Sequence, residues 1–214
     1  MIGLDRSAVI LAGGAATRFN NGDKGLLELN GKPLLNHVVE TVKGLVEEII
    51  IVTNTQERAD TYAKIVSAKA SFVLDTEEAK GPLMGALAGF EAAQGEYTLL
   101  LPVDSPFVSK EVLELLFDLA PGKAAVIPRH TDREIEPLHA VYNTSQTLSV
   151  IKETLTQNQF DMHSMIEQLR GVRYISTLVI EQIDPELKSF ININTPLDLK
   201  KAQETTRSKK TKKA

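Results

Sequence analysis

The 214-residue chain is predicted to fold as an α/β protein with a doubly wound, mostly parallel sheet and helices on both faces. Apolar runs of strand length alternate with segments of helical periodicity over the first 128 residues. The strand runs are continuously apolar, which is typical of strands buried on both faces of a parallel sheet. With 43% hydrophobic residues, the chain is long enough to bury one sizeable core, so residues 1–204 are expected to form a single domain.

The first five strands are apolar runs that end at or just before a glycine, amide, acid or proline. They are expected at residues 7–11, 48–54, 71–75, 97–104 and 124–128. Helices are expected at residues 33–43, 56–66 and 109–119, and residues 81–95 predict a turn followed by a helix of small residues. Pro33 suits a first helical position, Ser109 is a typical N-cap, and Gly95 stops the helix before it.

Beyond Pro128 the pattern is less regular. Residues 136–142 are expected to form another strand, followed by helices at 145–156 and 163–169. Residues 189–204 suggest a final strand, a turn and a closing helix. In that helix Thr195 is the expected N-cap and Pro196 the first residue.

Composition and charge exclude several classes of protein. The absence of cysteine rules out disulfides and thiolate metal sites, and the four histidines lack metal-ligand spacing. No apolar run approaches the ~20 residues that span a bilayer, and no signal peptide is recognisable, so a cytoplasmic location is expected without membrane contact. The net charge is −4 although the last eight residues carry five cations, so the body is acidic and no nucleic-acid partner is expected. Residues 205–214 predict a basic, disordered tail.

The segment after the first strand has the composition of a phosphate-binding loop. Ligands of open parallel sheets bind outside the carboxyl ends of the strands. Gly13 and Gly14 let backbone N–H groups approach phosphate oxygens closely, and Arg18 and Lys24 add positive charge. A glycine-rich surface turn with two solvated cations is the alternative.

This loop matches neither of the two most common phosphate-binding motifs. A Walker loop requires Ser or Thr after the lysine, whereas Lys24 is followed by Gly25 and Leu26. The dinucleotide fingerprint needs a third glycine, which "GGAATR" does not supply. Kinase and dehydrogenase functions therefore lose most of their support.

Acids and amides follow the other strands. Asp104 ends a buried strand, which predicts a Mg²⁺ ligand; the alternatives are a buried ion pair or a helix cap, for which Ser109 is better placed. Asp75 is either a loop acid or a group that accepts hydrogen bonds from guanine. Gly81 and Gly85 flank a turn in which main-chain groups can approach a base, because no side chain intervenes.

Several motifs occur in one order along residues 9–199: "LAGGAATRF", "DKGLLELNGKPLLNHV", "GPLMGAL", "LPVDSPF", "EPLHAVY" and "ININTPLDL". Together they resemble the molybdenum cofactor guanylyltransferases, a branch of the Rossmann-like nucleotidyltransferases. The chain departs from that family at Ala15 or Ala16, where a polar residue is usual, and at residues 18–20, "RFN", where "RMG" is common.

The resemblance implies transfer of GMP from GTP to the phosphate of molybdopterin cofactor, with release of pyrophosphate. It implies that Lys24, Arg18 and Asp104 are catalytic and that Asp104 binds Mg²⁺. Asn192 and Asn194 would close the site. The acceptor side is expected near Pro137, His139 and Tyr142, for which a structural strand is the alternative. The implied nucleotide-binding residues are Leu11, Ala12, Gly13, Gly14, Arg18, Lys24, Asn54, Asp75, Gly81, Pro82, Leu83 and Asp104.

Related enzyme activities are alternatives to guanylyl transfer. They are a cytidylyltransferase acting on the same cofactor, a cobinamide-phosphate guanylyltransferase and a sugar-phosphate nucleotidyltransferase. A GTP-binding accessory protein without turnover is a further alternative, against which Lys24 and Asp104 argue. GTP and molybdopterin cofactor are the expected small-molecule partners. Transient contact with proteins that insert or receive the cofactor is expected as well.

Overall fold

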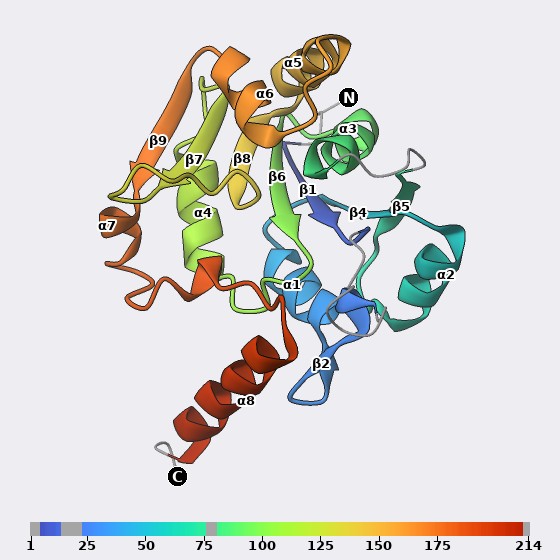
Figure 1. The fold of residues 1–214 in the computed structure, drawn as a ribbon, viewed down its shortest axis with the longest axis vertical. Helices are drawn as coiled ribbons and strands as arrows, with labels where there is room; N and C mark the ends of the chain where they lie inside the picture. Colours follow the sequence, from blue (N-terminus) through green and yellow to red (C-terminus); the bar gives the residue numbers. More distant parts are fainter. Residues whose placement is uncertain (1–4, 14–22, 76–80, 212–214) are drawn as a thin grey trace.

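The computed structural model describes residues 5–13, 23–75 and 81–211. Its centre is a seven-stranded sheet with the strand order β5-β4-β1-β6-β8-β7-β9 (Figure 1). Strand β8 is antiparallel to both of its neighbours, and the remaining pairs are parallel. The strands are β1 (Arg6–Leu11), β4 (Glu48–Thr53), β5 (Ser71–Leu74), β6 (Tyr97–Pro102), β7 (Ala125–Arg129), β8 (Ala140–Asn143) and β9 (Val172–Ser176).

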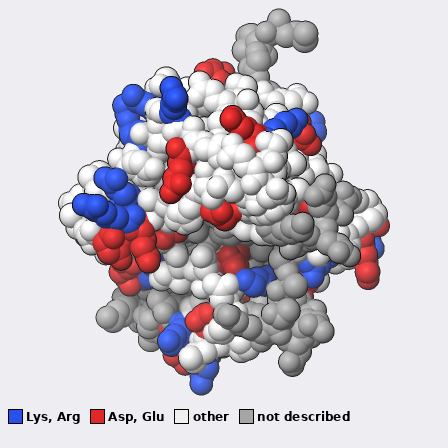
Figure 2. Space-filling view, turned by 45° about the horizontal axis from the view of Figure 1, so that its top comes forward, with Lys and Arg blue, Asp and Glu red and all other residues white. Residues whose placement is uncertain are grey.

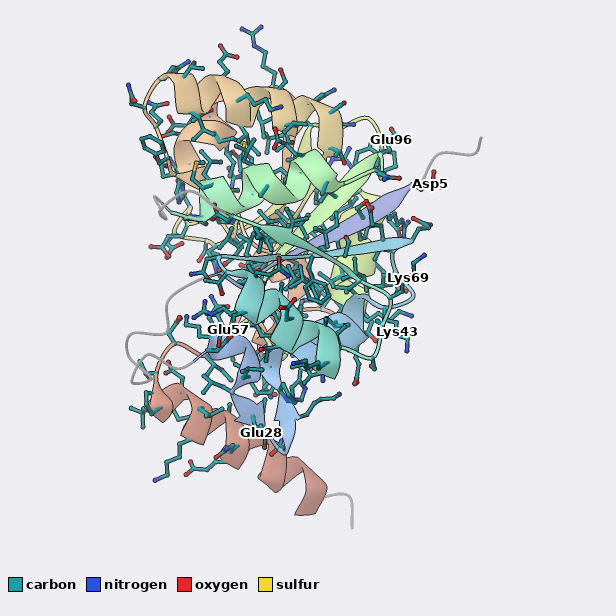
Figure 3. The ribbon with its side chains drawn as sticks, turned by 90° about the vertical axis from the view of Figure 1, so that its right-hand side faces the viewer. Asp5, Glu28, Lys43, Glu57, Lys69 and Glu96 are labelled. Carbon is teal, nitrogen blue, oxygen red and sulfur yellow. The ribbon has the colours of Figure 1, made fainter. Side chains whose placement is uncertain are left out.

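Helices cover both faces of the sheet. Helices α1 (Leu34–Val42), α2 (Gln56–Ile65) and α4 (Lys110–Asp118) pack on one face, where they share a core with Ala8 and Ile10 of β1. Val9 points to the opposite face, because successive strand residues alternate between faces. The helices on that face are α3 (Pro82–Ala92), α5 (Thr144–Thr156) and α6 (Met162–Gln168) (Figures 1 and 3).

The chain order of the strands locates the ligand edge of the sheet. From β1 the chain continues outward on one side through β4 and β5, and then returns to the other side of β1 as β6. This reversal is a topological switch point, where open α/β sheets bind ligands at the carboxyl ends of the strands. In Figure 3 Asp5, Lys69 and Glu96, which precede β1, β5 and β6, lie at one end of the sheet, and Glu57, which follows β4, lies at the other.

A small substructure lies beside the sheet. It comprises a short 3-10 helix η2 (Lys24–Leu26), the hairpin of β2 (Glu28–Leu29) and β3 (Lys32–Pro33), and the closing helix α8 (Pro196–Thr211). Leu29, Leu34, Ile193 and Ala202 form a separate apolar cluster that fastens α8 to the hairpin. Figure 1 shows α8 extending from the body of the molecule beside β2.

The sequence prediction of a doubly wound, mostly parallel sheet is confirmed, as are the first five strands, to within one or two residues at their ends. The Ser109 cap of α4 is present, and the Asp198 N–H donates to Thr195 Oγ1 at 3.2 Å at the start of α8. Ser109 therefore caps α4, and Asp104 is not needed as the cap of that helix.

Two expected strands in the second half of the chain differ from the structure, and several elements were not expected. The strand expected at 136–142 is limited to β8, because the residues before it form turns such as the His139 N–H to Glu136 carbonyl bond. The expected strand in 189–194 is replaced by η3 (Lys188–Phe190) and an irregular segment. Strand β9, the hairpin and the short helix α7 (Thr177–Ile180) were not expected. The edge strand β9 has exposed side chains at Arg173, Tyr174 and Ser176, so its sequence lacks a continuous apolar run.

Helix α8 continues across the expected domain boundary at residue 204, up to Thr211. The disordered tail stays a prediction, and residues 212–214 lie outside the described part. Among the helices that the structure describes, none combines the length and the hydropathy needed to cross a bilayer.

Candidate active site

A cavity of about 340 Å³ lies at the carboxyl ends of β1, β4, β5 and β6. Apolar side chains and glycine backbone form most of its wall, and an ammonium and three carboxylate or amide side chains enter it from the strand ends. The lining residues are Leu11, Gly13, Lys24, Val52, Asn54, Asp75, Gly81, Pro82, Gly85, Pro102, Val103, Asp104 and Leu138.

One end of the cavity holds a compact charged cluster. The Lys24 ammonium donates to Asp104 Oδ2 at 2.7 Å and to Asn194 Oδ1 at 2.6 Å. Asp104 is 8% exposed, and its main-chain carbonyl accepts the Ile193 N–H at 2.8 Å. Residues 80 and 170 positions away from Lys24 therefore meet at one point, and Asp104 forms the ion pair that was the alternative to a metal ligand.

The turn that carries Lys24 is built on Asp23. The Asp23 carboxylate caps η2 by accepting the Gly25 N–H at 2.9 Å, and it also accepts the Tyr62 hydroxyl. A Cβ on Gly25 would overlap that hydroxyl, so glycine is required there. Burial, together with the hydrogen bond to Asp23, raises the pKa of Tyr62, which therefore stays a protonated donor. The roles of Asp23 and Tyr62 were not expected: Asp23 was seen only as part of a motif next to Lys24, and Tyr62 lies within a helix, away from the strand ends.

The opposite end of the cavity is shaped by glycines at the start of α3. Gly81 has φ 104° and precedes Pro82, the first residue of the helix, so the chain enters α3 in a conformation that favours glycine. A Cβ on Gly85 would lie 3.2 Å from Leu11 Cδ2 and 3.7 Å from Asp75 Oδ2. Gly85 therefore packs closely against Leu11, and the start of α3 forms the part of the cavity wall near Asp75.

A polar network lies behind Asp104, on the side where the acceptor was expected. The Ser105 hydroxyl donates to Asn192 Oδ1 at 2.6 Å and lies 2.8 Å from His139 Nε2. Glu136 faces His139 Nδ1 at 3.4 Å and His130 Nε2 at 2.9 Å. Burial alone would raise the pKa of Glu136, but the two imidazoles hold that pKa below its ordinary value. This network joins the segment after β6 to Asn192.

Two of the expected acceptor-side residues are not at a ligand surface. Tyr142 is fully buried, packs edge-on against Phe90 at 5.9 Å between ring centroids, and donates its hydroxyl to the Pro137 carbonyl at 2.7 Å. His139 is only 2% exposed. Their interactions support the 130–139 loop from inside, whereas Leu138 reaches the cavity.

The remaining expected site residues divide into three groups. Eight line the cavity: Leu11, Gly13, Lys24, Asn54, Asp75, Gly81, Pro82 and Asp104. Ala12 and Leu83 are buried in the core beside it, and Ala12 donates its N–H to the Val52 carbonyl at 2.8 Å. Gly14 and Arg18 lie outside the described residues.

The donor set around Asp104 suits a hard cation. In the described part of the chain, no group of three or more His, Cys, Asp or Glu side chains is placed to hold a metal ion. The Asp104 carboxylate and the Asn194 amide oxygen nevertheless converge on one positive charge, the Lys24 ammonium. Mg²⁺ takes oxygen ligands and commonly uses one or two carboxylates together with substrate phosphates, so these residues fit it.

Residues 8–172 match the family of MobA-like NTP transferase domains. The chain belongs to this family. A protein of Methanosarcina acetivorans named probable molybdenum cofactor guanylyltransferase is 35% identical over 199 residues, which cover 91% of this chain and 88% of that protein. The molybdenum cofactor guanylyltransferase of Desulfosudis oleivorans is 32% identical, with 92% and 94% coverage.

The fold of this MobA-like NTP transferase is also found in a solved relative. The crystal structure of molybdopterin-guanine dinucleotide biosynthesis protein A from Archaeoglobus fulgidus has a TM-score of 0.79 at 29% identity, covering 94% of this chain and 99% of that one. Because the matched residues 8–172 include β1, η2, α3 and β6, the family assignment covers the elements that build the cavity.

Proposed function

We propose that this MobA-like NTP transferase transfers GMP from GTP to the phosphate of molybdopterin cofactor, giving the guanine dinucleotide form and pyrophosphate. One observation carries the proposal: the cavity joins a glycine-walled compartment beside Asp75 to the Lys24–Asp104 cluster. A nucleotide has the same division into a flat base and a charged phosphate chain. The names of the relatives in Methanosarcina and Desulfosudis support the choice of substrates.

Lys24 and Asp104 are the proposed catalytic residues. The lysine ammonium has three N–H donors, and within the described residues Asp104 and Asn194 accept two of them, which leaves a third for an α-phosphate oxygen. Fixed positive charge at that position stabilises the transition state of phosphoryl transfer. The sequence adds Arg18, which we assign to the departing pyrophosphate.

Mg²⁺ is the proposed cofactor, held by Asp104 with Asn194 close by. When bound, it supplies positive charge that neutralises phosphate oxygens. The acceptor phosphate is ionised at neutral pH, so the chain needs no general base. The cavity contributes by aligning the two substrates.

Asp75 and the start of α3 are the proposed guanine-reading elements. A carboxylate accepts hydrogen bonds from both the ring N–H and the amine of guanine, a pair of donors that cytosine lacks. Gly81 and Gly85 line the same cavity as that carboxylate and carry no side chain of their own. GTP is therefore preferred over CTP in this proposal.

The acceptor is assigned to the side of the cavity formed by Leu138 and the segment after Asp104. Asn192 borders this side through its bond to Ser105. Transient contact with proteins that insert or receive the cofactor, and action in the cytoplasm, complete the proposal.

Pyrophosphate release tests the proposal. The chain is incubated with Mg²⁺ and either GTP or CTP, each with and without molybdopterin cofactor. Release that requires both GTP and the cofactor is the expected result. Release with CTP would point to the cytidylyltransferase alternative, and GTP binding without release under any condition would point to an accessory protein.

A further inference from the structure

Arg58 connects two residues of the cavity wall, Gly13 and Asn54, with the turn that carries Lys24. Its Nη1 donates to the Gly13 carbonyl at 3.3 Å and to Asn54 Oδ1 at 3.0 Å, and its Nε lies 3.4 Å from Asp23 Oδ2. Gly13 follows β1, Asn54 follows β4, and Asp23 caps the turn that carries Lys24. One guanidinium therefore touches the segments that follow β1 and β4 and the turn that carries Lys24.

The position of Arg58 in its helix is not explained by helix stability. Thr55 caps α2 and accepts the Arg58 N–H at 3.3 Å, which places the arginine in the first turn. The first turn is the positive end of the helix dipole, where a cation is unfavourable. The Asp23 carboxylate, whose side chain is 14% exposed, offsets this charge. The arginine is therefore at this position because of its contacts outside the helix.

The contact with Asn54 determines what that amide offers to a ligand. Arginine carries only hydrogen-bond donors, so it engages the oxygen of the Asn54 amide and leaves the NH₂ group for other partners. Asn54 also lines the cavity. The amide therefore presents a donor to the cavity, and it suits an acceptor atom of the nucleotide.

The contact of Arg58 with Asp23 concerns the turn that carries Lys24. Asp23 accepts from Gly25 and Tyr62 through one carboxylate oxygen, and Arg58 lies beside the second oxygen. Both oxygens of the carboxylate are thus held, and the adjacent Lys24 leaves the turn toward Asp104. Loss of the guanidinium leaves a partly buried carboxylate without its cation next to the phosphate-binding lysine.

We propose that Arg58 is a positioning residue of the nucleotide site, which presents Asn54 as a hydrogen-bond donor to GTP and holds the Asp23–Lys24 turn in place. The inference rests on the proposed function, because it assumes that GTP occupies the cavity. Arg58 itself acts through Asn54 and Asp23.

Calorimetric titration with GTP in the presence of Mg²⁺ tests the proposal on the purified full chain. Arg58→Ala should weaken GTP binding by about tenfold or more, the scale of a lost charge-assisted hydrogen bond. Arg58→Lys should not restore binding, because one ammonium cannot bridge three groups in a planar arrangement. Guanidinium ion, added far below unfolding concentrations, should restore part of the affinity of Arg58→Ala, an effect that a purely structural role would not produce.

A double-mutant cycle with Asn54 supplies the second readout. If Arg58 acts through the amide, Asn54→Ala and Arg58→Ala together should weaken binding by less than the product of their separate effects. Arg6→Ala is the matched control, because Arg6 also pairs with an aspartate, Asp118 at 3.5 Å, but belongs to the start of β1. It should bind GTP like the wild type.

The outcomes separate the two proposals. Wild-type protein without affinity for GTP would overturn the proposed function. Wild-type affinity in Arg58→Ala, or strictly multiplicative effects in the cycle, would overturn the role of Arg58 alone. Thermal unfolding of each variant shows whether it is folded. If Arg58→Ala unfolds, Asn54→Ala decides, since unchanged GTP binding in that variant contradicts the donor role.

Discussion

At the scale of single residues, the site depends on side chains that are far apart in the sequence and meet at one charged cluster. Lys24 and Asp104 were both predictable, because each follows a buried strand and carries a chemistry that phosphate or Mg²⁺ requires. Charged side chains of both signs are interspersed over the face shown in Figure 2, so charge alone does not mark the site. What marked it was the place of Asp104 just after β6 and of Lys24 in the glycine-containing segment that follows β1.

Asp104→Ala and Lys24→Ala should each lower turnover by about 100-fold or more, because each removes charge that aligns or stabilises the transferring phosphate. Both proteins should remain folded, since Asn194 still accepts from Lys24 in the first variant and Asp104 keeps its main-chain bond to Ile193 in the second. Steady-state pyrophosphate release and circular dichroism measure the two effects. Near-normal rates in both variants would contradict the site assignment.

Asp23 belongs to the motif that begins "DKGLLELNG", but no role of its own was predicted for it. Arg58 and Tyr62 look like ordinary polar or core positions, and only the folded chain brings them to Asp23 under the Lys24 turn. Tyr142 was instead assigned a functional place that it does not have. It belongs to a motif and was expected near the acceptor, but its place on the buried side of β8 makes it a core residue.

At the scale of elements, strands with continuous apolar runs were predictable and irregular segments were not. The strands β1, β4 and β6 are buried on both faces, so their sequences show no alternation. Residues 191–194 alternate Ile and Asn, which suggests a strand. The segment instead leaves the sheet, because its amides bond to Ser105 and Lys24 and Ile193 enters the apolar cluster under α8.

Close packing of α3 on β1 depends on Gly89. A Cβ at this position would lie within 2.9 Å of Val9 Cγ2, and Val9 is fully buried. Gly89→Ala should therefore destabilise the protein by about 1–3 kcal/mol through overpacking, although alanine is the better helix former by about 1 kcal/mol. Chemical denaturation measures the change.

The control for this prediction is Glu91→Ala on the exposed side of the same helix. Glu91 pairs with Lys152 at 2.8 Å, and both side chains are about half exposed, so the loss should stay within about 0.5 kcal/mol. A stabilised Gly89→Ala protein would show that helix propensity outweighs packing at this contact.

At the scale of the whole molecule, the topology of the sheet brings the site residues together at one edge. Reversal of strand order at β1 places the ends of β4 and β5 on one side and the end of β6 on the other, and the final segment before α8 returns to the same edge. This arrangement was predictable from the alternation of strands and helices. The antiparallel direction of β8 was not predictable. It depends on a turn at residues 136–139, and that turn is not evident from the hydrophobic pattern of the sequence.

The central claim is that the cavity at this edge transfers a guanylyl group. The most direct measurement follows the label of [α-³²P]GTP in a reaction with Mg²⁺ and molybdopterin cofactor, with products separated by chromatography. The account predicts that the label moves into a product that contains both the pterin and guanine, with one pyrophosphate released for each transfer. Label that stays in GTP while the cofactor is recovered unchanged would contradict it.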